Sequence, residues 1–349
     1  MVKLLYFDIS SDFGFFKKPD VNRGNNGVLS LTYNIPPKPA ILGILGSILG
    51  MKGLVQHYDE NVKLRRLLDI KNVIDKDYNK AKKFAAKLDF STNEILKNME
   101  YTNATRFLEL INLLKSSNKK EFEPNIGELQ QLLDELQSEL TYPEYYRKLN
   151  HLKIGITPIG KFPFNKIMNK YNSKNSYFGD AKYENVLVSE QLLIKPKYSV
   201  YAYDEASNDI ITELFQRMKT NSPVFMPYLG KNEFIANFQN INIGNVEEIF
   251  LELETKIYSI FLSRQKEPNN TTSRSHNPLF GSNGGTSISV EGLPFGYLFY
   301  EHYPTNYNGV SLQYELRLVQ FTSDSVAASE IDMSKGKLLT FDNKVVYVF

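Results

Sequence analysis

The order of strand-like and helix-like segments most constrains how this chain can fold. Short segments rich in β-forming residues are interspersed with segments whose apolar residues recur at helical spacing. The predicted strands are residues 2–9, residues 152–159, one or two strands within 186–203 and a further strand after the second helix. The segment 186–203 is interrupted at Lys195 and Pro196, and the predicted helices are residues 40–49 and 209–219. The order strand, helix, strand, strand, helix, strand fits a ferredoxin-like, split βαβ sheet, so we expect an α+β fold.

The first predicted helix, at residues 40–49, is expected to be buried. Its residues are apolar on nearly every side, and the prolines just before it suit a helix start but not a helix interior. Gly43, Gly46 and Gly50 fall on one face at helical spacing, although each glycine costs about 1 kcal/mol relative to alanine in a helix. Three glycines on one face predict that another segment of backbone approaches the helix closely.

A helical block at residues 54–150 separates this helix from the next strand. The block contains 16 basic and 16 acidic residues, so its overall charge does not indicate a nucleic-acid-binding arm. Its last long helix is acidic, with seven carboxylates and neither Lys nor Arg within residues 121–146. Such a face is usually only solvated, and the alternative is a docking surface for a protein partner.

From about residue 244 onward, the sequence pattern predicts mainly β-strands. It ends in LLTFDNKVVYVF at residues 338–349, which predicts a hairpin with Asp342 and Asn343 in the turn. A segment rich in serine, asparagine and glycine at residues 263–289 predicts a long loop.

The composition excludes several kinds of site. The 349 residues include no cysteine, which excludes a disulfide framework, thiol catalysis and cysteine-ligated zinc. The net charge of +2 creates no overall basic field, so any nucleic-acid site must be a local patch. The longest apolar stretch, residues 40–51, is shorter than the ~20 residues that span a membrane. We therefore expect a cytoplasmic protein without a membrane partner.

The stretch KFPFNKIMNKYNSKNSYFGDAK, at residues 161–182, carries the clearest signal of RNA binding. It contains five lysines, one acidic residue, four asparagines and five aromatic residues, and it lies between two predicted strands. Lysines neutralise phosphates and aromatic rings stack on unpaired bases, which is the chemistry that single-stranded RNA requires. The alternative is a hairpin whose charges only keep it soluble.

Signals of catalysis are weak. The chain has four histidines, and none of them stands at metal-binding spacing from another. A metal-independent ribonuclease could use His151, Lys153 or Tyr58 as general acid, general base or charge stabiliser. A single histidine before a strand is more often an ordinary surface residue, so we expect no catalytic set, no metal and no cofactor.

Four segments resemble, in the same order, landmarks of the fifth Cas protein family. They are FGFFKKPDVN at residues 13–22, LTYNIPPKPAILGILGSILG at 31–50, PEYYRKLNHLKIGI at 143–156 and SPVFMPYLGKNEFIANF at 222–238. That family belongs to the RAMP superfamily, and its members cap the 5′ handle of the guide RNA in type I CRISPR Cascade complexes. The fuller likeness is to the I-B-like branch, and it covers residues 1–54 and 143–243.

The resemblance implies an RRM-like, ferredoxin-like RAMP domain with a β-hairpin thumb. It implies a domain at residues 1–243, with the helical insertion at 54–150 and the thumb at 161–185, followed by a β-rich C-terminal region at 244–349. The implied partners are the 5′ handle of the guide RNA, the large and backbone subunits of the complex and, through the complex, target DNA. One branch of the family cuts the guide precursor with a Tyr, Lys and His set, but this chain has no adjacent Lys-His pair.

Basic and aromatic residues in the thumb and in the landmarks are the RNA-binding candidates. They are Lys17, Lys18, Arg23, Lys161, Lys166, Lys170, Lys174, Tyr177, Phe178, Lys182 and Lys231. The expected function is RNA binding without enzymatic activity, and the alternative is an endoribonuclease that processes the guide precursor.

Overall fold

The computed structural model divides the chain into two compact units. One unit, here called the sheet unit, comprises residues 1–51, 148–308 and 312–349, and the other, the helical unit, comprises residues 52–147 and 309–311. The residues described within them are 3–18, 22–24, 27–54, 56, 69–87, 103–174, 185–206, 209–250, 254–264, 298–309, 313–322 and 325–349.

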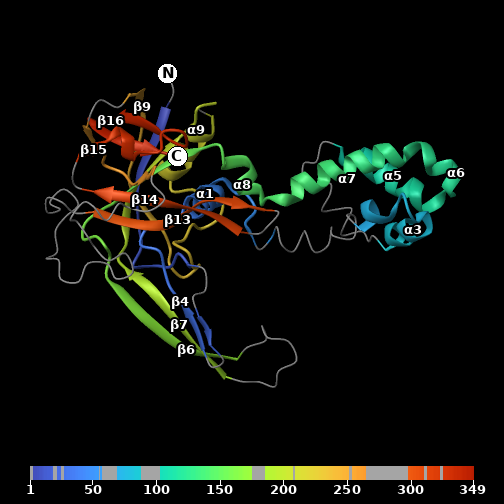
Figure 1. Ribbon diagram of the computed structural model, residues 1–349, viewed down its shortest axis with the longest axis horizontal. Coiled ribbons are helices and arrows are strands. Elements are labelled where there is room, and N and C mark those ends of the chain that lie inside the picture. The colour runs from blue at the N-terminus through green and yellow to red at the C-terminus, as the bar shows by residue number, and fades with distance from the viewer. Residues whose placement is uncertain are drawn as a thin grey trace. The chain divides into compact units, whose positions relative to one another are not determined.

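The sheet unit is built around a four-stranded antiparallel sheet (Figure 1). Its strands are β1 (Lys3–Ser10), β5 (Lys153–Pro158), β8 (Lys197–Tyr203) and β9 (Asn237–Asn245), in the spatial order β5-β8-β1-β9. In the chain, helix α1 (Lys38–Leu49) lies between β1 and β5, and α9 (Asp209–Lys219) joins β8 to β9. This is the predicted ferredoxin-like arrangement, and the predicted α+β class is confirmed.

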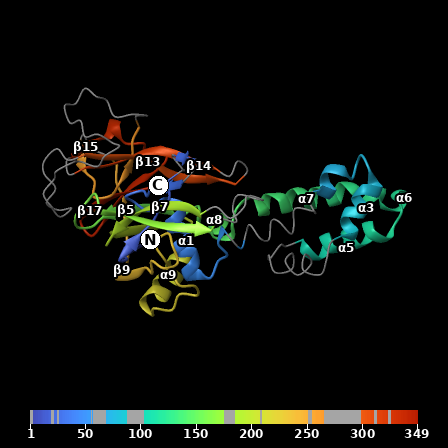
Figure 2. The same cartoon turned by 90° about the horizontal axis from the view of Figure 1, so that it is seen from below.

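Apolar side chains cover both faces of this sheet. Helices α1 and α9 pack against each other, and α9 packs against β1 and β9 (Figure 2). Strands β16 (Lys337–Phe341) and β17 (Lys344–Val348) contribute Leu339 and Val346 to a second core, where they pack with Leu4 and Tyr201 of the sheet. Because β1 is buried on both faces, its sequence is a nearly continuous apolar run instead of a strict alternation.

The described part of the C-terminal region is β-rich, as predicted. Strands β12 (Phe261–Leu262), β13 (Leu298–Asn308) and β14 (Gln313–Thr322) form one sheet, while β10 (Glu247–Glu248) pairs with β16, and β11 (Glu254–Lys256) pairs with β15 (Ser325–Ala327). The turn between β16 and β17 holds Asp342 at φ 48° and Asn343 at φ 59°, as a two-residue type I′ turn requires. The predicted loop at 263–289 lies outside the described residues from 265 onward, and the domain boundary at 243 stays a prediction.

The backbone approach predicted from the glycines occurs at the end of α1. Gly50 ends the helix in the left-handed conformation, with φ 82°. The amides of Val224 and Phe225 donate to the carbonyls of Ile48 (3.1 Å) and Ser47 (3.0 Å). A β-carbon at Gly50 would lie 2.8 Å from the Val224 side chain, so glycine is needed there for both its conformation and its size.

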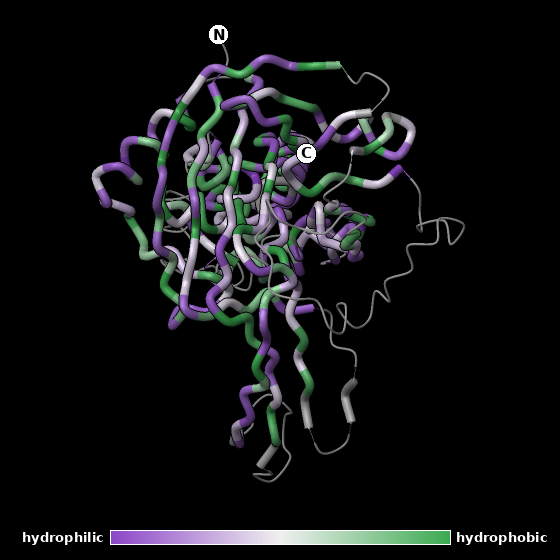
Figure 3. Tube along the Cα trace, turned by 90° about the vertical axis from the view of Figure 1, so that its left-hand side faces the viewer, coloured by the Kyte–Doolittle hydropathy of each residue, from purple (hydrophilic) through white to green (hydrophobic). Residues whose placement is uncertain are grey.

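A β-ribbon corresponds to the predicted thumb. Strand β6 (Lys166–Lys174) pairs antiparallel with β7 (Asn185–Ile194), and β7 also pairs with β2 (Phe13–Gly14) and, in parallel, with β4 (Gly27–Ser30). Strand β3 (Asn22–Gly24) pairs with β4. Figure 1 shows β4, β6 and β7 extending away from the central sheet, and Figure 3 shows hydrophilic and hydrophobic residues intermixed along this extension.

Two aromatic residues at the start of the thumb belong to the core. Phe162 and Phe164 are 5% and 7% exposed. The Phe162 ring lies 4.8 Å from that of Phe299, and the Phe164 ring lies 5.2 Å from that of Tyr198. These rings therefore anchor the base of the thumb and are not available to stack on bases, in contrast to the interpretation that counted all five aromatics of 161–182 toward RNA binding.

The helical unit has a core of its own. Its described helices include α3 (Tyr78–Ala86), α5 (Ala104–Ser116), α6 (Lys119–Phe122), the 3-10 turn η1 (Glu123–Asn125) and α7 (Ile126–Thr141), and α8 (Glu144–Leu149) leads back to β5. Apolar faces of α3, α5 and α7 meet around residues such as Phe107, Leu110 and Leu133, all essentially buried. None of the helices in the described ranges is both long and apolar enough to span a membrane.

The acidic residues of α7 are largely used within the helical unit. Glu128 forms an ion pair with Arg106, with 2.7 Å between Oε1 of Glu128 and Nε of Arg106, and Asp134 forms an ion pair with Lys71. Glu135 accepts a hydrogen bond from Asn103 at 2.9 Å. These contacts give the acidic helix a structural role, and a protein-docking role for it stays a prediction.

Candidate nucleic-acid interface

Three lysines form a row along one strand of the thumb. Lys166, Lys170 and Lys174 stand four residues apart in β6, and positions an even number of residues apart lie on the same face of a strand. At about 3.4 Å per residue, successive lysines are about 14 Å apart. Lys166 and Lys170 are exposed, and so is Lys161, which precedes the strand. The row offers regularly spaced cations to an extended polyanion.

The opposite face of β6 carries an exposed ring. Tyr171 is 41% exposed, and partial burial, followed by the nearby carboxylate of Glu190, raises its pKa. Glu190, on β7, forms an ion pair with Lys231, whose ammonium also lies 5.3 Å from the centroid of the Phe15 ring. Lys231 was predicted to bind RNA, but its charge is already neutralised within the protein.

A second ion pair lies at the base of the thumb. Lys18 pairs with Glu301 of β13, a carboxylate that is 10% exposed, and its ammonium lies 5.1 Å from the centroid of the Tyr33 ring. Surrounding protein atoms lower the pKa of Lys166; Glu301 opposes this shift and Lys18 adds to it. Lys18 and Lys166 thus share one electrostatic neighbourhood around Glu301. Lys17 is exposed, and its backbone forms an isolated antiparallel β-bridge with that of Thr32.

The remaining candidates fall into two groups. Arg23, in β3, and Lys174, in β6, have a described backbone but no described side chain. Tyr58, Tyr177, Phe178 and Lys182 lie outside the described residues. The stacking role predicted for Tyr177 and Phe178 therefore stays a prediction.

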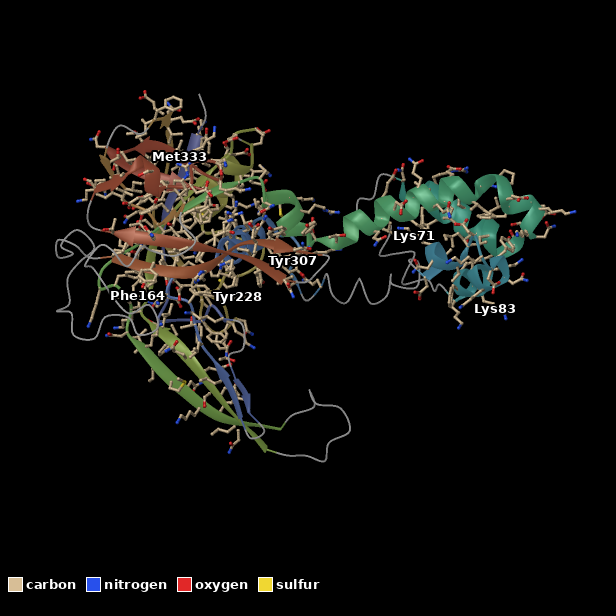
Figure 4. All side chains as sticks on the ribbon, viewed as in Figure 1. Lys71, Lys83, Phe164, Tyr228, Tyr307 and Met333 are labelled. Atoms are coloured by element: carbon tan, nitrogen blue, oxygen red, sulfur yellow. The ribbon has the colours of Figure 1, made fainter. Side chains whose placement is uncertain are left out.

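An exposed apolar loop at residues 222–236 is a surface that the sequence analysis did not assign. Phe225 is 45% exposed and Tyr228 is 43% exposed. The loop is nevertheless rigidly hydrogen-bonded, because the amide of Leu229 donates to the carbonyl of Phe234 at 2.8 Å. Exposed aromatic rings on a fixed backbone can stack on unpaired bases. Figure 4 labels Tyr228, and Phe164 at the base of the thumb.

The residues of the rival ribonuclease hypothesis show one organised contact. His151 is 43% exposed, and its Nε2 lies 3.3 Å from Oδ2 of the buried Asp204. Lys153 follows two residues later, at the start of β5. A buried lysine that sequence analysis missed, Lys38, has its pKa lowered to about 8 by desolvation and by the nearby charge of Lys153. Its position in the proline-rich PPKP segment gave no sign of burial.

The buried Lys38 makes a testable contribution to stability. Its folded-state pKa lies below the ordinary value, so the unfolded chain binds more protons between pH 8 and 10.5 and stability rises with pH in that window. Replacing Lys38 by Met removes the cost of burying a charge and should stabilise the protein by about 1–3 kcal/mol at pH 7. Urea unfolding should show this gain shrinking as pH rises from 8 to 10.5. The exposed Lys344→Met variant is the control, and an equal gain there would contradict the explanation.

Comparisons with known proteins give similar structures but no family. No family model and no curated protein matches the chain. One similar structure is a chain of a CRISPR RNA-guided surveillance complex, 10% identical with a TM-score of 0.36, covering 94% of this chain and 93% of that one. Another is a CRISPR protein from Archaeoglobus fulgidus, 10% identical with a TM-score of 0.37, covering 99% and 98%.

A third similar structure is a chain of the type III-B Cmr-beta complex bound to cognate target RNA and AMPPnP. It is 11% identical with a TM-score of 0.35, covering 99% of this chain and 98% of that one. At such TM-scores the backbones superpose only loosely, so the ferredoxin-like assignment rests on the strand order of the central sheet.

Proposed function

We propose that this chain is an RNA-binding, non-enzymatic subunit of a CRISPR interference complex. In this proposal it caps the 5′ handle of the guide RNA in a type I complex and joins the large and backbone subunits. The observation that carries the proposal is the row of Lys166, Lys170 and Lys174 on a ribbon that extends from a ferredoxin-like sheet. The four ordered sequence landmarks support the CRISPR part of the proposal.

The chemistry of the thumb suits single-stranded RNA better than a duplex. The lysine row meets phosphates, and the exposed rings of Tyr171, Phe225 and Tyr228 offer faces for unpaired bases. A duplex keeps its bases stacked inside and could use only the lysines. The sheet unit offers exposed rings as well as lysines, and this combination favours a single strand.

Lys18 and Lys231 receive a different role from the one predicted for them. Each is paired with a largely buried carboxylate and lies over an aromatic ring. Breaking such a pair would leave the carboxylate buried without its partner, so the exchange for a phosphate is costly. We assign these two lysines to positioning the base of the thumb, and the β6 lysines to binding phosphate.

Purification of the chain with its native partners, followed by sequencing of the bound RNA, tests the proposal. The expected result is a population of RNAs that share one 5′ sequence and differ downstream of it. RNAs without a common 5′ end, or no bound RNA at all, would overturn the handle-capping function.

A metal-independent ribonuclease is the second candidate, favoured by the contact between His151 and Asp204. A buried carboxylate can orient a histidine and stabilise its protonated form, as general acid–base catalysis requires. However, cleavage of RNA needs both an acid and a base. Within the described part of the chain, the only side chain bonded to His151 is that of Asp204.

We therefore expect no site-specific cleavage when the isolated protein is incubated with repeat RNA and the products are resolved on a denaturing gel. The His151→Ala and Asp204→Asn variants should give the same uncut pattern as the parent. Cutting at one position that both variants abolish would replace the binding function with the ribonuclease. Cutting that persists in His151→Ala would point to a contaminating nuclease.

A further inference from the structure

The helical unit carries a basic surface that its balanced composition conceals. Residues 76–87 contain five lysines and a single acidic residue, Asp77. Asp77 caps helix α3, since its side chain accepts a hydrogen bond from the Lys80 amide at 2.9 Å. The Asp77 carboxylate therefore stabilises the start of the helix, and residues 76–87 contain no second acidic residue to accompany their five lysines.

Three of these lysines form a stripe on the outward face of α3 and its C-cap residue, Lys87. Lys80, Lys83 and Lys87 are spaced by three and four residues, which places them on one side of a helix. Each follows a buried residue (Tyr78, Ala81 or Ala85) by two positions, or about 200° around the helix. The stripe thus points directly away from the core and spans about 10 Å along the axis. Lys83, labelled in Figure 4, points outward from the helical unit.

The described residues of the helical unit do not balance the charges of the stripe. None of Lys80, Lys83 and Lys87 forms an ion pair with any residue that the structure describes, and the only described aromatic contact is that of Lys80 over Phe84, at 6.0 Å. Lys82, by contrast, donates to the Ser117 carbonyl at 2.7 Å. The acids of α7 are occupied by other partners, such as Arg106 and Lys71. These paired acids therefore do not neutralise the stripe.

The surroundings of the stripe favour nucleic acid over protein. Protein interfaces are depleted of lysine and are built around buried apolar and aromatic side chains. Among the described large apolar residues that are well exposed, only Leu54 and Leu113 belong to the helical unit, and neither lies on α3. A surface of lysines without an apolar centre suits a phosphate backbone, where cations supply most of the affinity.

The same surface favours a duplex over a single strand. Single-stranded nucleic acid is bound by stacking bases on aromatic rings as well as by cations. The exposed residues of α3 include no aromatic ring, and Phe84, the ring beside Lys80, is partly buried against the core of the helical unit. A duplex needs none, because its bases are already stacked and its outer surface is a fixed array of phosphates.

We infer that Lys80, Lys83 and Lys87 form a second nucleic-acid contact, which binds the phosphate backbone of a duplex without reading its sequence. This contact goes beyond the proposed function, since it lies in the helical unit and does not involve the thumb. Contacts to phosphate position a protein but carry no sequence information. The inference therefore predicts similar affinity for unrelated duplexes of equal length.

The test measures binding of the full chain to fluorescent 20-base-pair DNA and RNA duplexes of unrelated sequence, over a range of KCl concentrations. The variant Lys80→Gln, Lys83→Gln, Lys87→Gln should bind each duplex more weakly. It should also reduce the slope of log K against log salt by up to about 2.7, since each phosphate contact with a duplex contributes ~0.9. Binding of single-stranded handle RNA should stay unchanged, which separates this inference from the proposed function.

A control variant removes the same charge elsewhere. Lys219, Lys335 and Lys344 are exposed lysines of the sheet unit. Their replacement by Gln should change the slope for duplex binding by no more than about 0.5, because only the general effect of the lower net charge remains. An equal loss in both triple variants, or no duplex binding by the parent at low salt, would overturn the inference. The inference would also be overturned if the Lys80, Lys83 and Lys87 variant bound duplexes as the parent does but no longer co-purified with an acidic protein that the parent binds. Tighter binding to the DNA duplex or to the RNA duplex would identify which of the two nucleic acids this contact binds.

Discussion

Replacing Lys166, Lys170 and Lys174 together with alanine should flatten the salt dependence of RNA binding by about two units. Each lost phosphate contact with a single strand removes ~0.7 from the slope of log K against log salt. The three positions lie four residues apart in β6 and so belong to one face of the strand, and the lysines are expected to act on successive parts of one RNA backbone. Affinity at low salt should fall for every RNA sequence alike, because phosphates carry no sequence information.

The measurement is a salt titration of 5′-handle RNA with the chain in its assembled complex. Lys219→Ala, Lys335→Ala and Lys344→Ala in combination form the matched control, since this variant has the same net charge and an intact thumb. Tyr171→Ala and Tyr228→Ala should weaken binding by ~1–3 kcal/mol per lost stack, with the slope preserved. If the thumb triple variant keeps both the slope and the affinity of the parent, the ribbon is not the RNA site.

Replacing Gly230 with alanine should destabilise the sheet unit by about 2–5 kcal/mol. Gly230 has φ 89°, and a β-carbon there would lie 1.7 Å from the carbonyl oxygen of Phe15. A left-handed residue other than glycine costs ~1–3 kcal/mol, and displacing a tightly packed backbone adds a similar amount. Since the Phe15 amide donates to the carbonyl of Leu229 at 3.1 Å, this displacement would also disturb the backbone beneath Lys231.

Gly160 offers the control for this variant. It also has a left-handed backbone, with φ 85°, but nothing lies within 4 Å of the position of its β-carbon. Gly160→Ala therefore carries only the conformational cost, of ~1–3 kcal/mol. Chemical denaturation of both variants gives the comparison. A Gly230→Ala variant that is no less stable than Gly160→Ala would contradict the close approach of the two segments.

Local patterns in the sequence were sufficient for most of the secondary structure. The helix predicted at 209–219 has the observed bounds of α9, and the break predicted at Lys195 and Pro196 separates β7 from β8. Asp342 and Asn343 lie in the hairpin turn, as predicted, with both residues at positive φ. Such features depend on residues close in the chain, for which periodicity and turn chemistry are direct signals.

The candidate site was predicted less completely, because its electrostatics involve residues far apart in the chain. The sequence indicated a basic thumb, but it could not reveal that Glu301 neutralises Lys18 or that Glu190 neutralises Lys231. The pairs join residues 283 and 41 positions apart, and no local pattern links them. Similarly, the balanced charge of residues 54–150 gave no sign of the lysine stripe, because composition counts charges without placing them on faces.

The sequence by itself determined the α+β class, the order of the elements and the position of the basic thumb segment. These follow from periodicity, from prolines and glycines, and from the local density of charge. Only the tertiary structure decided which charges face solvent and which are paired, and that Phe162 and Phe164 belong to the core. The physical reason is that burial and ion pairing depend on contacts between distant segments, and these exist only once the sheet and the helices have packed.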